Sequence, residues 1–333
     1  MLRLVKVLLG ASLLWSLYWL AAGWGLRNSI STWFAEQQRQ GWQAEYSSLG
    51  SGGFPTHHTT RITSPTLADP GTGTAWRADW LEVDSPAIWP GRQTLRFAPT
   101  PQRLSYFDQT AVIETANMQA QLHLEPGLAL TLEAFALSSD HWRISTDDGS
   151  LVDATSMQLG MVRTSSPLTY RVDFVATEFT PGPNLRHLFA ATDALPSSFE
   201  TLGLDMEVTF DTSWNRSALE LRRPQPRHIN LKLADAHWGA LRLKATGELQ
   251  VDERGSPTGV IALKIENWRE MLSMAEQAGA LPASARDGIE RVLALFSGFG
   301  GNSGDLDTQL TIRDGYVSLG PIPIGTAPRL ILR

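Results

Sequence analysis

The sequence contains no cysteine among its 333 residues, and this absence excludes several kinds of chemistry. Disulfide bonds, thiolate metal sites and cysteine nucleophiles all require that residue. Basic residues are also few: 28 lysines and arginines stand against 34 acidic residues, which gives a net charge of −6. They are scattered along the chain, so we expect no nucleic-acid partner, because a phosphate-binding surface needs a basic excess.

Sharp catalytic motifs are missing as well. The chain has no Gly-x-Ser-x-Gly elbow, no phosphate-binding loop and no His-Glu-x-x-His pair. The adjacent pair His57 and His58 would point to opposite faces of a strand, so it cannot hold one metal ion. The glycine-rich stretch at residues 297–305 lacks the spacing of a dinucleotide site and is typical of a linker. We therefore predict no catalytic, cofactor-binding or metal-binding residues.

One long hydrophobic run is present, at residues 7–26. Twenty helical residues span about 30 Å, the thickness of a bilayer core. Arg3 and Lys6 precede the run, and aromatic residues crowd its second half. Because positive flanks stay inside, this pattern predicts a single-pass helix with a cytoplasmic N-terminus, which places the rest of the chain in the periplasm. Membrane lipid around residues 7–26 is thus the first predicted partner.

A cleaved signal peptide is the alternative for this run. Its apolar part would be shorter, about 7–15 residues, and the small residues at Ala21, Ala22 and Gly23 make an irregular cleavage site. We therefore favour a retained anchor. Residues 28–41 have helical spacing up to Gly41, either as a short separate helix or as a continuation of the anchor. The predicted organisation is an anchor region over residues 1–41 and a β-rich periplasmic domain over 42–333.

Beyond residue 41 the dominant hydrophobic period is two. Residues 112–124 alternate apolar and polar side chains, and residues 128–137 repeat the pattern after Pro126-Gly127, which predicts one long hairpin over 112–137. Asp314-Gly315 is a strong signal for a two-residue hairpin turn. We count roughly a dozen strands. Because one face of each is polar, the sheet should be antiparallel.

The predicted fold is therefore mainly β, with long antiparallel strands in a large curved sheet, a sandwich or a groove. Helical spacing is confined to a few segments, of which residues 267–297 form a predicted helical hairpin, and residues 183–192 form a candidate short helix. The proline-rich segment at residues 222–228 is the best candidate for a subdivision of the domain.

The stretch from Leu243 to Trp268 contains four carboxylates that could suggest an active site. Alternation assigns them instead to the wet side of a hairpin: Glu248 shares a face with Arg242 and Lys244, and Asp252 lies at the turn. Each exposed ion pair there should contribute under about 1 kcal/mol.

Glu114 and Asp153 differ from these carboxylates, because each occupies the apolar parity of its strand. A buried carboxylate has a raised pKa, as general acids do. A periplasmic hydrolase that acts on a glycan or another envelope component through these two residues is therefore the alternative function. The simpler interpretation places Glu114 near a strand end or beside an arginine such as Arg103.

Taken together, the segment "GWQAEYSSLGSGGFPTHHTTRITSPTL" after an anchor, the turn Gly53-Phe54-Pro55 and the stretch "AWRADWLEVDSPAIWP" resemble an uncharacterised bacterial family. This family is the domain of unknown function 2125, found mainly in alphaproteobacteria. Thr56-His57 departs from the Phe-Arg that often follows the proline. The second half is also similar to the closing segments of AsmA-like envelope proteins. That similarity implies an inner-membrane-anchored β protein with a lipid-facing apolar groove.

The resemblance assigns no catalytic residues. The predicted function is therefore non-catalytic binding or scaffolding in the cell envelope, with a lipid or a protein as the ligand of an apolar sheet face. A subunit whose strand edges pair with a partner is a further alternative.

Overall fold

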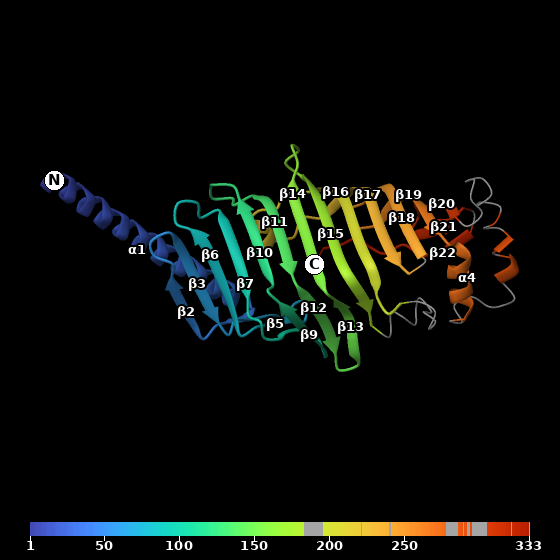
Figure 1. Cartoon of the computed structure of the whole chain (residues 1–333), viewed down its shortest axis with the longest axis horizontal. Coiled ribbons are helices and arrows are strands. Elements are labelled where there is room, and N and C mark those ends of the chain that lie inside the picture. Colours follow the sequence, from blue (N-terminus) through green and yellow to red (C-terminus); the bar gives the residue numbers. More distant parts are fainter. Residues whose placement is uncertain are drawn as a thin grey trace.

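The computed structural model describes residues 1–182, 196–220, 222–239, 241–277, 286–288, 290, 291, 294, 305–320 and 322–332. Within them, 22 strands form one large antiparallel sheet (Figure 1). The predictions of a mainly β chain and of antiparallel pairing are thus confirmed, and the sheet is open. The strands are more numerous than the predicted dozen; the alternating segment at residues 112–124, for example, contributes to two strands.

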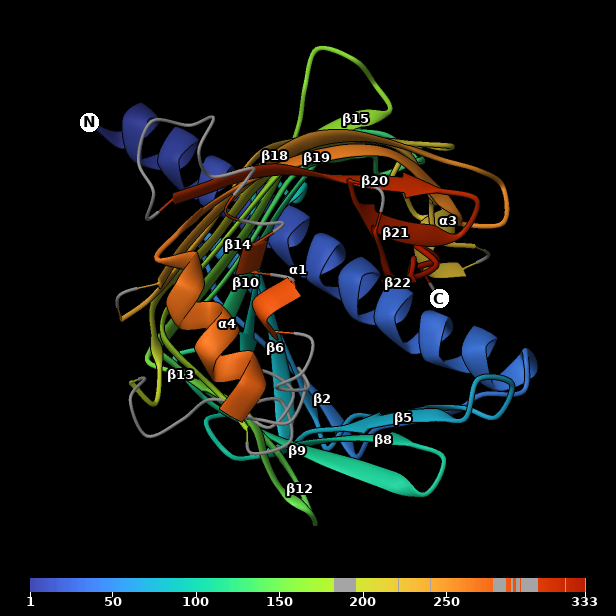
Figure 2. The ribbon, with the colours of Figure 1, turned by 90° about the vertical axis from the view of Figure 1, so that its right-hand side faces the viewer.

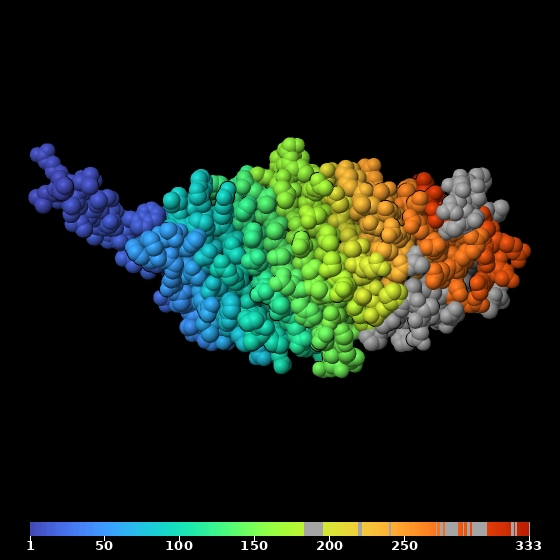
Figure 3. Space-filling view, in the orientation of Figure 1, coloured from blue at the N-terminus to red at the C-terminus, as the bar shows by residue number. Residues whose placement is uncertain are grey.

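A single helix, α1 (Leu2–Arg39), begins the chain. It joins the apolar run to the following helical segment without a break, and it ends just before Gly41, whose φ of 93° suits only glycine well. Its N-terminal part projects from one end of the molecule (Figure 3). Its C-terminal part lies against the sheet, where Phe34 packs into the core.

The strands form two walls, which we name by their length. The long wall runs from β2 to β22 in one hydrogen-bonded order, and the short wall runs from β1 to β13 and joins the long wall where β13 pairs with β15. Viewed along the molecule, the short wall turns away from the long wall, so that the cross-section is C-shaped (Figure 2). The strands of the long wall, in order of pairing, are β2 (Ser48–Gly52), β3 (His57–Thr63), β6 (Trp80–Pro86), β7 (Arg92–Phe97), β10 (Gln119–Leu124), β11 (Leu132–Ser139), β14 (Ser156–Arg163), β15 (Thr169–Pro181), β16 (Phe199–Phe210), β17 (Pro226–Trp238), β18 (Leu241–Val251), β19 (Pro257–Glu266), β20 (Asp305–Arg313), β21 (Tyr316–Leu319) and β22 (Ile322–Thr326). Those of the short wall are β1 (Gln43–Glu45), β4 (Thr66–Asp69), β5 (Thr74–Arg77), β8 (Gln102–Tyr106), β9 (Gln109–Ala116), β12 (His141–Thr146) and β13 (Gly149–Ala154).

The chain crosses repeatedly between the walls, and we call the line of crossings the crease. At the crease the parity of the side chains that face the concave side changes by one residue. Thr115 of β9 is buried on that side, and after the crossing Ala120 of β10 is buried there. An extra residue of this kind acts as a β-bulge, which bends the strand and re-aims its side chains. Three crossings contain a non-glycine residue with positive φ, namely Ser64, Asn117 and Glu178.

The predicted hairpin over residues 112–137 was wrong in its first strand, because the chain bends at Asn117. Residues 109–116 and 119–124 are separate strands in different walls, and only β10 and β11 form the hairpin. Leu128 lies in its turn and is exposed rather than paired. Alternation alone did not reveal the break, because a one-residue bulge leaves both halves alternating.

The two ends of the sheet are covered by helices on the concave side. Phe34 of α1 packs with Ala44, Leu49 and Ile62 at one end. At the other end α4 (Trp268–Gln277) places Trp268 and Leu272 on Ile265 and Leu306. The first half of the predicted helical hairpin is therefore present. In its second half residues 286–288, 290, 291 and 294 are helical, and the remainder lies outside the described residues, as does the candidate helix at 183–192.

Two other sequence features have clear positions. Asp314 and Gly315, with φ of 54° and 78°, form the two-residue turn between β20 and β21, as predicted. Segment 222–228 leads from the loop after β16 into the first residues of β17, and these two strands pair from Thr201–His237 to Phe210–Pro226. A four-residue helix, α3 (Ser217–Glu220), precedes it.

Substitutions of Ser64 test the backbone requirement at the crease. Its φ of 50° lies in the left-handed region, which costs an ordinary residue about 1–2 kcal/mol and a β-branched residue more. We expect Ser64→Gly to leave the free energy of unfolding nearly unchanged and Ser64→Val to lower it by about 1–2 kcal/mol. Urea unfolding of the detergent-solubilised chain, followed by tryptophan fluorescence, measures both. Equal midpoints for the two variants would contradict this account.

Candidate functional site

The concave side of the long wall carries three unbroken rows of mostly apolar residues, which we call the inner face. The residues of each row are direct partners on successive strands, so their side chains share one face. The central row passes through ten strands: Val83, Leu95, Ala120, Leu137, Leu159, Phe174, Leu204, Ala234, Ala245 and Leu263. Nine steps of about 4.8 Å give it a length of about 43 Å.

Two further rows flank this one and contain no charged residue. The first is Leu122, Phe135, Met161, Val172, Met206, Leu231, Gly247, Ile261, Leu310 and Leu319. The second, nearer the crease, is Ser139, Met157, Ala176, Leu202, Ala236, Leu243, Ile265 and Leu306. A continuous apolar surface of this extent is unusual, because soluble proteins normally expose apolar residues singly or in small patches.

The larger side chains in the middle of the central row are only partly buried, whereas Ala120 and Ala245 in that row are buried. Leu95, Leu137, Leu159, Phe174 and Leu204 are all intermediate in exposure. By contrast, Ile62 and Ile265, under α1 and α4, are 5% and 7% exposed. Within the described part of the chain, the helix packing falls at the two ends of the sheet, so the middle presents apolar side chains without a complete protein cover.

One edge of the inner face is closed by a small aromatic cluster. Tyr170, Val208 and Phe210 are buried together, and Trp214 packs on them with its ring at 90° to that of Phe210. The Tyr170 hydroxyl donates a hydrogen bond to the carbonyl of Leu132 at 2.9 Å. Burial raises the pKa of this hydroxyl, which therefore stays protonated at neutral pH. The cluster defines where the apolar surface ends.

The convex side is polar and carries cross-strand ion pairs. Glu82 accepts from Arg61 on one side and Arg96 on the other, at 2.9 and 3.2 Å, and Arg171 pairs with Asp205 at 2.7 Å. The carboxylates near Trp268 belong here as predicted. Glu248 is exposed and lies 2.6 Å from His228, while Asp252 accepts backbone N–H bonds in its turn. None of these contacts is buried, so each contributes little to stability.

Glu114 and Asp153, the candidates for acid–base chemistry, lie on this convex side of the short wall. Arg143 stands between them in register, and its Nε donates to Asp153 Oδ2 at 2.5 Å. The prediction that both occupy an apolar face was wrong, because each strand changes parity at the crease a few residues later. The arginine beside Glu114 is Arg143 and not Arg103, whose strand partner is Val112.

The two adjacent histidines point to opposite faces, as strand geometry requires. His57 is exposed and His58 is 6% exposed, and burial lowers the pKa of His58. The His58 ring stacks on Trp19 of α1, with centroids 5.1 Å apart. In the described residues no group of three or more histidines, aspartates or glutamates is placed to hold a metal ion.

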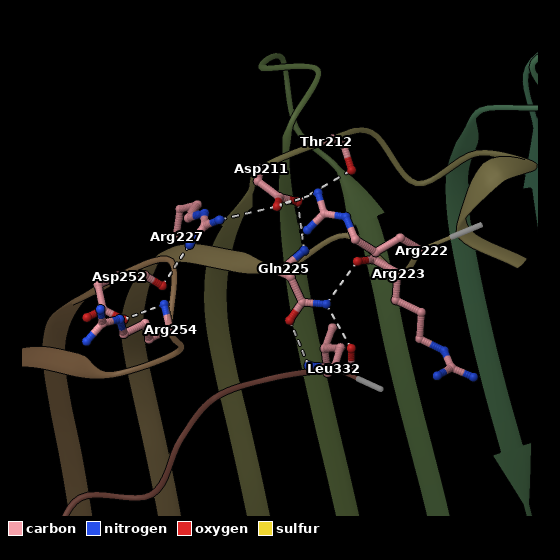
Figure 4. Close-up of polar contacts among 9 residues, drawn as sticks. All are labelled: Asp211, Thr212, Arg222, Arg223, Gln225, Arg227, Asp252, Arg254 and Leu332. Atoms are coloured by element: carbon pink, nitrogen blue, oxygen red, sulfur yellow. Dashed lines mark hydrogen bonds and ion pairs between the residues drawn. The ribbon is translucent and has the colours of Figure 1, made fainter. Parts of the chain in front are cut away.

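The ends of β16 and β17 form a polar cluster that holds the C-terminal segment (Figure 4). Asp211 accepts hydrogen bonds from the Gln225 backbone and from Arg222, at 2.8 and 2.9 Å, and Arg227 approaches it at 3.4 Å. The Gln225 side chain in turn both donates to and accepts from the backbone of Leu332, at 2.8 and 2.9 Å. The cluster therefore fastens the chain end to the sheet.

The ionisation of Asp211 is coupled to this arrangement. Burial raises its pKa, but the hydrogen bonds from Gln225 and Arg222 and the charges of Arg222 and Arg227 outweigh that effect, so the pKa lies below its ordinary value. Sequence analysis missed this cluster. The segment "RRPQPRH" was noted only for its prolines, and the partner Asp211 lies eleven residues before Arg222, with no regular spacing to connect them.

The comparisons with known proteins agree with the resemblance seen in the sequence. A family model described as "Uncharacterized protein conserved in bacteria (DUF2125)" matches residues 19–328, and the chain therefore belongs to this family. No curated protein matches the chain. The match includes the turn at Gly53-Phe54-Pro55 and both walls of the sheet, but it assigns no role to any residue.

Asp211→Asn tests the cluster through its pH dependence. A carboxylate whose folded pKa is lowered adds stability that is fully present above its unfolded pKa, about 3.9, and is lost as the pH falls towards its folded pKa. We expect the variant to unfold more easily than the wild type from pH 5 to 8, and the difference to shrink below about pH 4. Unfolding midpoints across this range measure it.

Asp205→Asn is the matched control, since it removes an exposed partner of one arginine. It should change the free energy of unfolding by less than about 1 kcal/mol. If Asp211→Asn changes the free energy of unfolding no more than Asp205→Asn does at every pH, the polar cluster around Asp211 adds no more stability than an exposed ion pair.

Proposed function

We propose that this member of the DUF2125 family is a membrane-anchored envelope protein that holds the acyl chain of a lipid against its inner face. The observation that carries the proposal is the continuity of the apolar rows, about 43 Å long and only partly buried between α1 and α4. A protein core of this size would be expected to have a complete second layer.

The chemistry of the inner face favours an acyl chain over other ligands. No charge stands in its three rows, and its polar groups are few, so a charged or strongly polar ligand would lose hydration without gaining partners. An acyl chain needs no hydrogen bonds and gains about 0.8 kcal/mol for each methylene that leaves water. The flexible residues Met161 and Met206 in one flanking row suit a ligand of variable shape.

The anchor supports a lipid source for this ligand. Helix α1 is long and apolar enough to cross a membrane, and its C-terminal end packs directly on the concave side of the sheet. Arg3 and Lys6 favour a cytoplasmic N-terminus and a periplasmic sheet. The similarity of the second half to AsmA-like envelope proteins, suggested by the sequence, would agree with this orientation.

Catalysis has less support than binding. The two carboxylates on which a hydrolase would depend face Arg143 on the convex side, away from the inner face. We therefore propose binding rather than hydrolysis as the function.

Adjacent residues of β15 provide a direct test of the inner face. Phe174 lies in the central row, and Val175, 45% exposed, points to the convex side. We expect Phe174→Asn to reduce the lipid that co-purifies with the detergent-extracted chain and Val175→Asn to leave it unchanged, because only the first places an amide against the acyl chain. Native mass spectrometry measures the bound lipid, and circular dichroism checks that both variants are folded. Wild-type protein free of lipid, or equal loss in both variants, would refute the proposal.

A fusion tests the orientation of the chain. Alkaline phosphatase joined after residue 333 should be active, because it folds only outside the cytoplasm, and green fluorescent protein joined there through the same export route should be dark. The reverse pattern would overturn the proposed topology. Fusions to a variant with Arg3→Glu and Lys6→Glu serve as the comparison, since losing the positive flank should weaken the preference.

A further inference from the structure

Three aromatic side chains of α1 bind the ends of the first strands of the long wall. Trp15 Nε1 donates to the carbonyl of Pro55 at 3.0 Å, and Trp19 Nε1 donates to that of His57 at 2.8 Å. The Tyr18 hydroxyl donates to the carbonyl of Ala87 at 2.6 Å. Pro55 and Ala87 belong to two hairpin loops, residues 53–56 and 87–91, and His57 is the first residue of β3; the loops lie side by side because β3 pairs with β6.

The two loops have an unusual surface for segments outside a membrane. Neither contains a charged residue. Their tips carry Phe54, Ile88 and Trp89, which are 56%, 69% and 62% exposed. Phe54 also contacts Trp19 edge to face, with ring centroids 5.4 Å apart. Exposed aromatic and aliphatic side chains at adjacent uncharged tips are typical of a surface that contacts a membrane.

The position of these contacts along α1 determines whether the loop tips reach the membrane. The apolar run ends at Leu26, and the next charged residue is Arg27. Trp19 is seven residues earlier, which corresponds to about 10 Å along a helix. If the run crosses the bilayer, its Trp15–Trp19 turn lies below the outer boundary of the hydrocarbon core, and loops bound to that turn cannot remain wholly in water.

The hydrogen bonds themselves fit a non-aqueous setting. Backbone carbonyls in a membrane have no water to bind, and an unsatisfied one costs several kcal/mol. The carbonyls of Pro55, His57 and Ala87 each receive a donor from α1. Tryptophan and tyrosine are also the residues that prefer the boundary between headgroups and acyl chains.

We propose that the tips at Phe54, Ile88 and Trp89 insert into the leaflet on the side of the membrane away from the N-terminus, beside α1. The partner is the lipid of that leaflet, from the headgroup boundary into the acyl chains. The central row of the inner face begins at Val83 of β6, close to these loops, so inserted tips bring this end of the inner face to the membrane lipid. This inference rests on the proposed function, because it requires α1 to span the membrane.

Site-directed fluorescence tests the insertion in the full-length protein. The chain has no cysteine, so single substitutions can be labelled with a nitrobenzoxadiazole dye without background. Three sites are compared in vesicles of phosphatidylcholine and phosphatidylglycerol: Ile88→Cys at a tip, Leu8→Cys within α1, and Val260→Cys on the convex side of β19. Nitroxide groups at shallow or deep acyl positions then quench the dye according to its depth.

The inference predicts strong quenching at Ile88 by nitroxides on the acyl chains, and none at Val260. Leu8 should be quenched as well. If Leu8 is quenched and Ile88, like Val260, is not, then α1 enters the membrane but the loop tips do not, and the inference is wrong. If neither Leu8 nor Ile88 is quenched, the membrane anchor of the proposed function fails, and the inference fails with it.

Discussion

The architecture depends on one geometric constraint at the crease. Side chains of a strand alternate between faces, so a strand that bends from one wall into the other would send its apolar side chains to the wrong side unless its parity changed. The extra residue at each crossing makes that change, and small buried residues such as Ala98 and Ala154, 1% and 0% exposed, allow the walls to approach there. Both walls can thus direct apolar residues to the concave side, and the rows of the inner face follow from it.

Helix α1, which is long and apolar enough to span a membrane, is joined to the sheet at a defined place. One of its ends supplies Phe34 to the core, and its middle supplies three hydrogen-bond donors to the loops of the first strands. A flexible linker would leave the sheet free to turn, whereas a continuous helix of 38 residues held at both levels restricts its orientation. If α1 spans the membrane, the concave side is therefore held in a fixed relation to the lipid.

The exposed charged residues contribute more to the solubility of the protein than to its stability. The cross-strand ion pairs of the convex side are largely exposed to solvent, so each adds little stability, and their main effect is to keep that side soluble. Asp211 differs from these residues, because it accepts a hydrogen bond from the Gln225 backbone and also lies beside two arginines. Through Gln225 it belongs to the contacts that hold the C-terminal segment along the ends of β16 and β17.

The sequence by itself determined whatever depends on local periodicity. Alternation from Leu241 to Ile265 predicted a hairpin with Glu248 on its wet side, and Asp314-Gly315 predicted a turn, because side-chain direction and turn type follow from neighbouring residues. Only the tertiary structure decided where the strands bend. Glu114 shares the parity of Ala120 in the sequence and yet faces Arg143 on the opposite side, since the extra residue at Asn117 leaves both halves of the pattern intact. The contacts between Trp19 and His57, and between Asp211 and Arg222, likewise join residues with no regular spacing, because strand pairing and chain reversal, rather than local sequence, bring them together.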